Sequence, residues 1–224
     1  MVLNLILVDC GLELIPKEIR DHPSVKKNIK SKNYASQVLD NSLHHSAMVR
    51  LRNFEKRGRP DILHNCLLNA LGSPLSKNKL LKIYFHTINN RIFEINPEIR
   101  ITRNYNRFKG LIAKLLIDGN IKFNHTFLIK ELKQDISHLV DSIKKKEVLI
   151  FSSKGNLIEH HLDLFRDDLS KNYITIIGGF QKGGFSENIL ELSKKIISIS
   201  KYSLDAWIVV SKVISFYEIV NDIK

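Results

Sequence analysis

A chain of 224 residues with 43% hydrophobic and 26% charged residues has the composition of a globular protein that is large enough to bury a full core. No apolar run reaches the length of a transmembrane helix, and the N-terminus lacks the basic start and the small-residue cleavage site of a secretory signal. The two cysteines, Cys10 and Cys66, do not make a disulfide framework. We therefore expect a protein of the reducing cytoplasm without membrane attachment.

The net charge of +12 is concentrated in the first part of the chain. Residues 1–120 carry 20 lysine and arginine residues against 10 acidic residues, whereas residues 121–224 carry 15 against 13. Nucleic acid is the usual partner of such a basic region, because phosphate charge supplies most of the binding energy. A basic surface that serves only solubility is the alternative.

The first 72 residues predict one strand and several helices. The apolar run Val2–Val8 is typical of a buried strand. Four segments are predicted to follow it: 12–20 and 24–31 are short helices or irregular segments, and 41–54 and 62–71 are helices. Asp40 is a candidate N-cap for the third of these segments. Asp61 precedes the fourth directly, so its position alone predicts a second N-cap.

Residues 81–95 predict a β-hairpin. Leu81–Thr87 and Arg91–Ile95 alternate around Asn89-Asn90, a pair that tolerates the positive φ of a two-residue turn. The hairpin segment is expected to be a lobe inserted into an α/β core.

Arginines recur in the segment that follows the hairpin. If this segment is helical from residue 100, Arg103 and Arg107 lie on one face and Arg100 lies one turn ahead. Few acids stand beside them, and guanidinium groups match phosphates and base edges, so the pattern favours a polyanion. A solvated helix face is the alternative. Asp118-Gly119-Asn120 is expected to end this helix.

The last third of the chain predicts a parallel sheet. Three short apolar strands are expected at Glu147–Phe151, Tyr173–Ile177 and Ile196–Ser200, each followed by a small or polar loop. Helices are predicted around them, at 136–146, 157–170, 189–195 and 206–223. Ligands bind outside the carboxyl ends of such strands, so we place a small-molecule site where the three loops meet. Trp207, Val210, Ile214 and Tyr217 share one face of the last helix, which indicates a core or a subunit interface.

The loop after the second strand is Gly178-Gly179-Phe180-Gln181-Lys182-Gly183-Gly184-Phe185, with four of the ten glycines. Glycine lets the backbone approach a ligand closely, although a tight turn is the alternative. The loop is not a dinucleotide fingerprint, because Phe180 occupies the place of the second glycine, and it is not a P-loop. No histidine or cysteine spacing predicts a metal site, and nothing marks a hydrolytic nucleophile. A reaction that mainly holds two substrates in line fits best.

Taken together, these motifs resemble the Nep/Emg family of ribosome-biogenesis methyltransferases, a branch of the SPOUT superfamily. The motifs follow one another along nearly the whole chain: Arg57-Gly58-Arg59-Pro60-Asp61-Ile62, Ser73-Pro74-Leu75, Tyr84-Phe85-His86-Thr87, Glu94-Ile95-Asn96-Pro97, Arg100-Ile101-x-Arg103-x-x-x-Arg107-Phe108-x-Gly110-Leu111, Ile177-Gly178-Gly179-Phe180-x-x-Gly183-x-Phe185 and Ser203-Leu204-x-Ala206-Trp207.

The resemblance implies a single α/β domain over residues 1–224, with a SPOUT-type parallel sheet and a C-terminal trefoil knot. It implies a basic RNA-binding lobe with the hairpin at about 40–120 and a knotted cofactor-binding part at about 147–224. It also implies a homodimer formed through the knotted region, which suits the Trp207 face.

The implied activity is transfer of a methyl group from S-adenosylmethionine to N(1) of a pseudouridine in small-subunit rRNA, with a role in small-subunit biogenesis. Ribosomal proteins or assembly factors are further candidate partners. The RNA-binding residues are by resemblance Arg59, Arg100, Arg103 and Arg107. Asp61 matches an aspartate that orients Arg59 and is a candidate proton acceptor. The cofactor-binding residues are by resemblance Ile177, Gly178, Gly183, Ile199, Ser200, Lys201, Tyr202, Ser203 and Leu204.

Two positions depart from the family pattern: Ser203 and Thr102 both replace a proline that is usual there. The alternative function is an rRNA-binding assembly factor whose methyl transfer is dispensable. A nucleotide-dependent α/β enzyme unrelated to RNA is disfavoured by the missing phosphate motif and by the basic first half of the chain.

Overall fold

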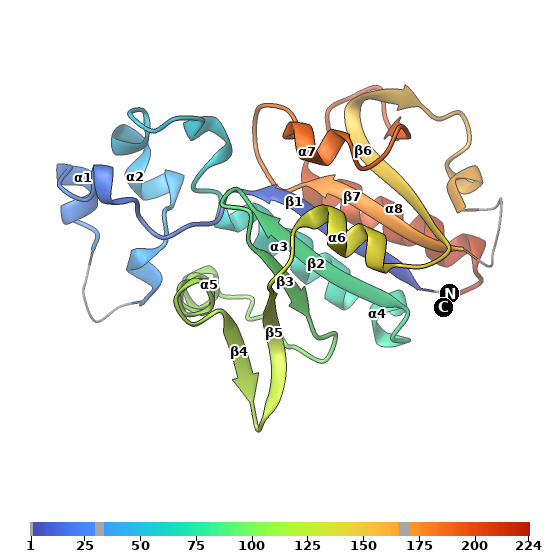
Figure 1. Ribbon diagram of the computed structural model, residues 1–224, viewed down its shortest axis with the longest axis horizontal. Coiled ribbons are helices and arrows are strands. Elements are labelled where there is room, and N and C mark those ends of the chain that lie inside the picture. Colours follow the sequence, from blue (N-terminus) through green and yellow to red (C-terminus); the bar gives the residue numbers. More distant parts are fainter. Residues whose placement is uncertain (1, 30–33, 166–170) are drawn as a thin grey trace.

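The computed structural model describes residues 2–29, 34–165 and 171–224, which form one mixed β-sheet with helices on both faces (Figure 1). The strands are β1 Leu3–Cys10, β2 Leu81–Thr87, β3 Ile92–Ile95, β4 Asn120–Phe123, β5 Thr126–Leu132, β6 Lys146–Leu157, β7 Asn172–Gly178 and β8 Ile196–Ser198. The α-helices are α1 Pro23–Lys26, α2 Asn41–Met48, α3 Pro60–Gly72, α4 Pro74–Lys77, α5 Tyr105–Asp118, α6 Ile136–Ser142, α7 Glu187–Leu190 and α8 Ala206–Val220. Short 3-10 helices lie at Lys17–Ile19 (η1), Tyr34–Gln37 (η2), Phe54–Lys56 (η3) and His161–Phe165 (η4).

The sheet has the order β4-β5-β3-β2-β1-β7-β6-β8. The five strands from β2 to β8 in this order run parallel, while β3, β5 and β4 continue the sheet in antiparallel pairs. β1 lies between β2 and β7, and all eight of its residues are buried. A strand covered on both faces must be apolar throughout, which explains the continuous run at the start of the sequence.

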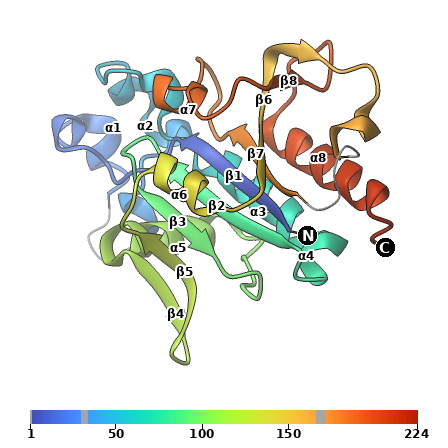
Figure 2. The same cartoon turned by 45° about the vertical axis from the view of Figure 1, so that its right-hand side comes forward.

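Two hydrophobic cores lie on opposite faces of the sheet. Leu3, Leu5 and Leu7 of β1 pack with the apolar sides of α3, α5 and α8. The alternate residues Ile6 and Val8 pack with α6 and α7 on the other face. Figure 2 shows α8 at the right of β7, and it packs on the face of the sheet opposite α6. A third, smaller cluster joins α1 and α2 to the segment after β1, at the left of Figure 1.

The predicted strands are present. The three C-terminal strands pair in parallel in the order β7-β6-β8, and the first apolar run adds β1 beside them. The polar loop predicted after Phe151 was wrong, because β6 continues to Leu157. The hairpin is also present, but it is part of the central sheet rather than an inserted lobe, because β2 is a parallel neighbour of β1. Its turn is longer than predicted, because Thr87 N donates to Arg91 O at 2.9 Å and only Asn90 takes a positive φ, of 55°.

The ends of several helices were predicted wrongly. α2 stops at Met48 instead of residue 54, because Asn53 with φ 55° and Gly58 with φ 64° turn the chain back toward β1. α5 begins at Tyr105, because Asn104 caps it by accepting a hydrogen bond from Arg107 N at 3.0 Å. Arg100 and Arg103 therefore precede the helix.

Among the described residues of 12–20 and 24–31, the structure has the short helices η1 and α1 with irregular chain around them, in agreement with the prediction of short helices or irregular segments. Other helix predictions were too long, because α6 and α8 end at Ser142 and Val220. α7 covers Glu187–Leu190 only. Residues 157–165 form the end of β6 and η4 rather than a helix, and the rest of that predicted helix, 166–170, lies outside the described residues. No helix in the described part of the chain is long and apolar enough to cross a membrane.

Candidate functional site

The loops that follow β1 and β7 meet at the carboxyl edge of the parallel sheet, and the loop after β8 leaves from the same edge. Val8 of β1 pairs with Gly178 of β7, and Gly179 N donates to Val8 O at 2.7 Å. The backbones are so close that a Cβ on Gly179 would overlap Cys10 Sγ. Glycine is therefore required there by packing, independently of any ligand.

The glycine loop after β7 has an open, mainly backbone surface. Gly183 takes a φ of 100°, a conformation that favours glycine, and its surroundings are exposed. The Phe180 ring covers Gly178, where a Cβ would lie 2.7 Å from the ring. Phe180 also packs edge-on against Phe185, with ring centroids 5.5 Å apart. The loop can present peptide groups to a ligand, and Phe180 forms its apolar wall.

The segment after β8 reaches the same edge from the other side of β6. Ile199 is buried, and its carbonyl oxygen lies 3.0 Å from His161 Nε2. Ser200 shapes the next turn, because its Oγ accepts a hydrogen bond from Tyr202 N at 3.0 Å. Tyr202 itself is 79% exposed. Since β7 and β8 both pair with β6, the structure brings together the strand ends that carry the sequence-predicted cofactor residues.

Arg59 and Asp61 form a two-bond ion pair at the start of α3. Arg59 Nε and Nη2 donate to the two carboxylate oxygens of Asp61 at 2.8 and 2.6 Å. This side-chain hydrogen bonding raises the pKa of Arg59. The prediction that Asp61 is the helix N-cap was wrong, because Arg59 occupies that position and Asp61 lies in the first turn. Asp61 holds the guanidinium in one plane, as a bidentate pair does.

Arg59 lies close to both predicted binding regions. Its backbone N–H donates to Gly11 O at 3.0 Å, at the end of β1. Its guanidinium lies within electrostatic range of Tyr105 and of the carboxylates of Asp61 and Asp205. Tyr105 begins α5, whereas Asp205 immediately precedes α8 and follows the β8 loop. Arg59 therefore lies where the arginine segment meets the cofactor segment.

Arg57 differs from Arg59 although both belong to the same basic motif. Its Nε and Nη2 each donate to a carboxylate oxygen of Glu13 at 2.6 Å, and both side chains are largely covered. Hydrogen bonding to Glu13 raises the pKa of Arg57. Arg57 therefore anchors the motif to the chain after β1, whereas Arg59, whose side chain is 19% exposed, is paired within the motif with the more exposed Asp61.

The other three arginines that the sequence predicts to bind RNA, Arg100, Arg103 and Arg107, are exposed. Within the described residues, no carboxylate lies at ion-pair distance from Arg100, Arg103 or Arg107. His64 of α3 fixes the segment before α5, because its Nε2 lies 2.7 Å from Thr102 O and its ring stacks on Phe108 at 4.3 Å. These arginines are unpaired cations held on an ordered support.

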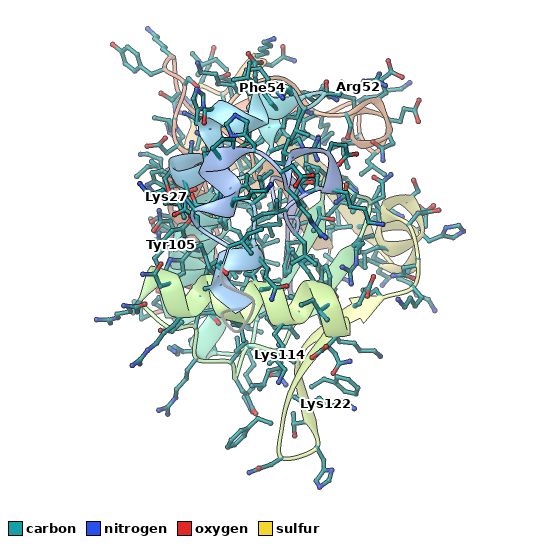
Figure 3. All side chains as sticks on the ribbon, turned by 90° about the vertical axis from the view of Figure 1, so that its left-hand side faces the viewer. Lys27, Arg52, Phe54, Tyr105, Lys114 and Lys122 are labelled. Carbon is teal, nitrogen blue, oxygen red and sulfur yellow. The ribbon has the colours of Figure 1, made fainter. Side chains whose placement is uncertain are left out.

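That support contains a buried ion pair that sequence reasoning missed. Asp40 caps α2 as predicted, since it accepts from Ser42 N at 3.0 Å, but it also accepts from Lys109 Nζ at 2.8 Å and Tyr105 Oη at 3.1 Å. Burial opposes ionisation of Asp40, but hydrogen bonds from Lys109 and Ser42 outweigh it and lower the pKa. Lys109 falls among the apolar side chains of α5, and that position was the available sequence signal. Figure 3 views this side, with Tyr105 and Lys114 on α5.

The fold and the site define a class of protein. A parallel α/β sheet offers backbone groups at its carboxyl edge for a small molecule, and oriented arginines beside it suit a polyanion. This combination is typical of an enzyme that transfers a group from a small cofactor to a nucleic acid.

Comparison with known proteins identifies the family. The EMG1/NEP1 methyltransferase family matches residues 5–218. The ribosomal RNA small subunit methyltransferase Nep1 of Staphylothermus marinus is 41% identical over 215 residues, 95% of this chain and 93% of that protein. Nep1 of Thermococcus sibiricus is 41% identical over 222 residues, 97% and 98% of the two chains. The crystal structure of Archaeoglobus fulgidus Nep1 bound to S-adenosylhomocysteine is 35% identical, covers 99% of this chain and 100% of that one, and has a TM-score of 0.84. The chain belongs to the EMG1/NEP1 methyltransferase family.

Proposed function

We propose that this protein transfers a methyl group from S-adenosylmethionine to N(1) of a pseudouridine in small-subunit rRNA and acts in the biogenesis of that subunit. Family membership and the names of the relatives support the reaction class and the rRNA substrate. The observation that carries the proposal for this chain is the Arg59–Asp61 pair, oriented beside the strand-end loops and the arginine segment. N(1) specificity follows the known role of the family.

The residues at the sheet edge fit the proposed cofactor. The solved Archaeoglobus relative binds S-adenosylhomocysteine, the demethylated product. In this chain Ile177, Gly178 and Gly183 would contact the cofactor from one side, with the glycine backbone open at Gly183. The backbone of 199–204 would contact it from the other. When bound, the cofactor supplies an electrophilic methyl group.

We propose that the arginines bind RNA phosphates on either side of the target nucleotide. Arg100, Arg103 and Arg107 are exposed and carry charge that no described carboxylate neutralises. The target base would leave its loop and enter the space beside Arg59, as base-modifying enzymes require. The nitrogen that gains the methyl group must lose its proton, and Asp61 is the proposed acceptor or the residue that orients Arg59 for this step.

Substitution of Asp61 separates these two roles. Asp61→Asn removes the charge but keeps an oxygen that can accept a hydrogen bond from Arg59. If Asp61 accepts the proton, the rate of methyl transfer collapses and its dependence on pH loses the acidic limb. If Asp61 only orients Arg59, a reduced rate with an unchanged pH profile results.

Three finer features also belong to the proposal. A trefoil knot in the C-terminal part is consistent with the strand order β7-β6-β8 and with family membership. A homodimer is supported by exposed apolar side chains on α8, Ile208 and Ile219, since Val210, Ile214 and Tyr217 are buried within this chain. The basic part at about 40–120 is the proposed RNA-binding lobe, and two buried free cysteines suit a cytoplasmic location.

The deciding experiment is a methyl-transfer assay on small RNA hairpins. Labelled S-adenosylmethionine is incubated with the protein and a hairpin that carries pseudouridine in its loop, and the modified nucleoside is identified by mass spectrometry. We expect methylation at N(1) of pseudouridine and none on the matched hairpin with uridine. RNA binding without methyl transfer, in protein that binds S-adenosylhomocysteine, would contradict the enzyme and favour the assembly factor.

A further inference from the structure

Lys56 lies between the glycine loop and the arginine motif. It ends η3 and directly precedes Arg57, so its backbone belongs to the basic segment. That backbone is fixed on the end of β1, because a Cβ on Gly11 would overlap the Lys56 carbonyl oxygen. The side chain of Lys56 is only 20% exposed. A lysine this covered is part of the packing and not a free surface charge.

The side chain of Lys56 contacts the glycine loop along its length. Its Nζ lies 4.8 Å from the centroid of the Phe180 ring, in the geometry of a cation–π contact. Its Cε lies beside Gly183, where an added Cβ would come within 3.2 Å. The stem therefore supports two residues of the loop that is proposed to bind the cofactor.

The ammonium group of Lys56 also shares a buried carboxylate with the far end of the same loop. Asp9 Oδ2 lies 3.3 Å from Lys56 Nζ and accepts a hydrogen bond from Ser186 N at 2.8 Å. Asp9 Oδ1 accepts from Ser186 Oγ at 2.8 Å. The side chain of Asp9 is 6% exposed, so its charge depends on these partners. Lys56 and Ser186 are thus held to one another through Asp9.

The same lysine is tied to the arginine motif by rigid connections. Arg57 is locked to Glu13, and Arg59 N donates to Gly11 O, so residues 56–59 can move little relative to each other. RNA that binds Arg59 would hold this segment in one position, and Lys56 would carry that constraint to Phe180, Gly183 and Asp9.

We propose that Lys56 is a positioning residue that couples the two sites, so that bound RNA strengthens cofactor binding and bound cofactor strengthens RNA binding equally. The inference rests on the proposed function, because it requires RNA at Arg59 and the cofactor at the glycine loop. The physical basis is that residues 56–59 and the glycine loop are packed as one unit through Lys56, so a displacement that one ligand imposes on this unit also acts on the binding region of the other. Such coupling is reciprocal and typically amounts to about 5–150-fold in affinity.

The test measures the affinity for S-adenosylhomocysteine by titration calorimetry, alone and with a saturating pseudouridine hairpin. We expect the hairpin to raise this affinity by about fivefold or more in the unmodified protein. In Lys56→Met, which keeps the stem and removes the charge, we expect a ratio near one. Lys56→Arg restores a cation and is expected to recover part of the ratio. Lys144→Met is the matched control, because Lys144 is exposed near the opposite end of β6.

The outcomes separate the inference from the proposed function. Absence of direct hairpin binding by the unmodified protein would contradict the function itself. Hairpin binding with an affinity ratio of one, or a ratio that Lys56→Met leaves unchanged, would overturn the coupling and leave the function standing. If Lys56→Met does not fold, Ser186→Ala tests the same connection by removing one hydrogen bond to Asp9, and an unchanged ratio in it would overturn the coupling equally.

Discussion

Two neighbouring regions of the molecule are built by different means. The glycine edge is the strand-end loop with Gly178, Gly179 and Gly183, and the arginine surface is the region of Arg59, Arg100, Arg103 and Arg107. At the glycine edge, parallel strands end together and present backbone groups, and Gly179 is packed so tightly that a Cβ has no room. At the arginine surface, side-chain charge is proposed to bind RNA, on a segment with little regular structure before α5. Its order comes from side-chain pairs: Arg59 with Asp61, Arg57 with Glu13, and Lys109 with Asp40.

This difference shows that the two regions should fail in different ways. Backbone recognition is lost through steric obstruction, whereas charge-based recognition is lost when a charge or its buried counter-ion is removed. Substitutions in one region should therefore leave the ligand affinity of the other largely intact, except at residues such as Lys56 that contact both.

The largest expected effect is the loss of the buried pair below the arginine surface. Lys109→Met leaves the Asp40 carboxylate without its cation. Because both side chains are less than 10% exposed, water cannot replace that cation. The free energy of unfolding should fall by about 3–5 kcal/mol. Urea denaturation of the variant and of Lys114→Met, an exposed position on the same helix, provides the comparison.

The pH dependence checks the cause of that loss. The pKa of Asp40 is lowered in the folded protein, where hydrogen bonds from Lys109 and Ser42 outweigh burial, so its contribution is present above the unfolded pKa of about 3.9. It is lost as the pH falls through the folded value. The stability difference between the unmodified protein and Lys109→Met should therefore shrink below about pH 4. A stability difference that stays constant down to pH 2 would contradict the ion pair as its cause. Equal losses of stability in Lys109→Met and Lys114→Met would show that the burial of Lys109 is not the reason for the loss.

The next effect in size is on RNA affinity alone. Arg103→Ala removes an exposed guanidinium that no described carboxylate pairs with, so binding of the pseudouridine hairpin should weaken by about 1–3 kcal/mol. The slope of log affinity against log salt concentration should become less steep by about one unit, because one phosphate contact is lost. Fluorescence anisotropy at several salt concentrations measures both quantities. A parallel loss of S-adenosylhomocysteine affinity would indicate misfolding instead.

A smaller effect is expected at the glycine edge. In Gly178→Val, the new Cβ would lie 2.7 Å from the Phe180 ring. This clash should lower the affinity for S-adenosylhomocysteine by about tenfold or more, which corresponds to about 1.4 kcal/mol. Gly184→Val is the matched control, since nothing lies within 4 Å of a Cβ there. Titration calorimetry measures the affinity of both variants for S-adenosylhomocysteine. An equal loss of affinity in Gly184→Val would mean that any bulky side chain in the loop weakens binding.

The smallest effect concerns the stiffness of the β8 loop. By the family resemblance, a proline is expected at the position of Ser203, so Ser203→Pro should raise the free energy of unfolding by about 0.4–1 kcal/mol by restricting the unfolded chain. Thermal unfolding, with and without S-adenosylhomocysteine, measures this change. A drop in stability would show that the backbone at Ser203 does not suit proline.

Much of the fold could be predicted from local patterns. The strands β1, β6 and β7 contain continuous apolar runs, because both faces of the sheet are covered, and Gly119 ends α5 with a φ of 74°. The failures have non-local or competing causes. The end of β6 was predicted to be a loop at 152–156 that leads into a helix, but Asn156 and Leu157 pair with Ile197 and Ser198 of β8, which is remote in the sequence. Asn104 caps α5 and excludes Arg100 and Arg103 from it.

The candidate site divides in the same way. The sequence motifs predict that the glycine loop, Asp61 and two groups of arginines belong to the site. One group is Arg57 and Arg59, the other is Arg100, Arg103 and Arg107, and the roles of these residues stay predictions. Asp61 lies within the motif, but the motif could not show that Arg57 is paired with a carboxylate from outside it. Arg57 binds Glu13 from 44 residues away, and Lys109 binds Asp40 from 69 residues away. Neither distance along the chain carries a signal in a single sequence.

The sequence by itself determined the buried strands, the strand-end loops and the excess of positive charge, because apolar periodicity, glycine and charge act locally. Only the tertiary structure decided which charges are paired, which arginines stay exposed, and that Lys56 reaches Asp9 from 47 residues away. The physical reason is that a side chain's solvation and counter-ions are set by whatever the fold packs against it. That neighbourhood is assembled from strands and helices that are remote in sequence.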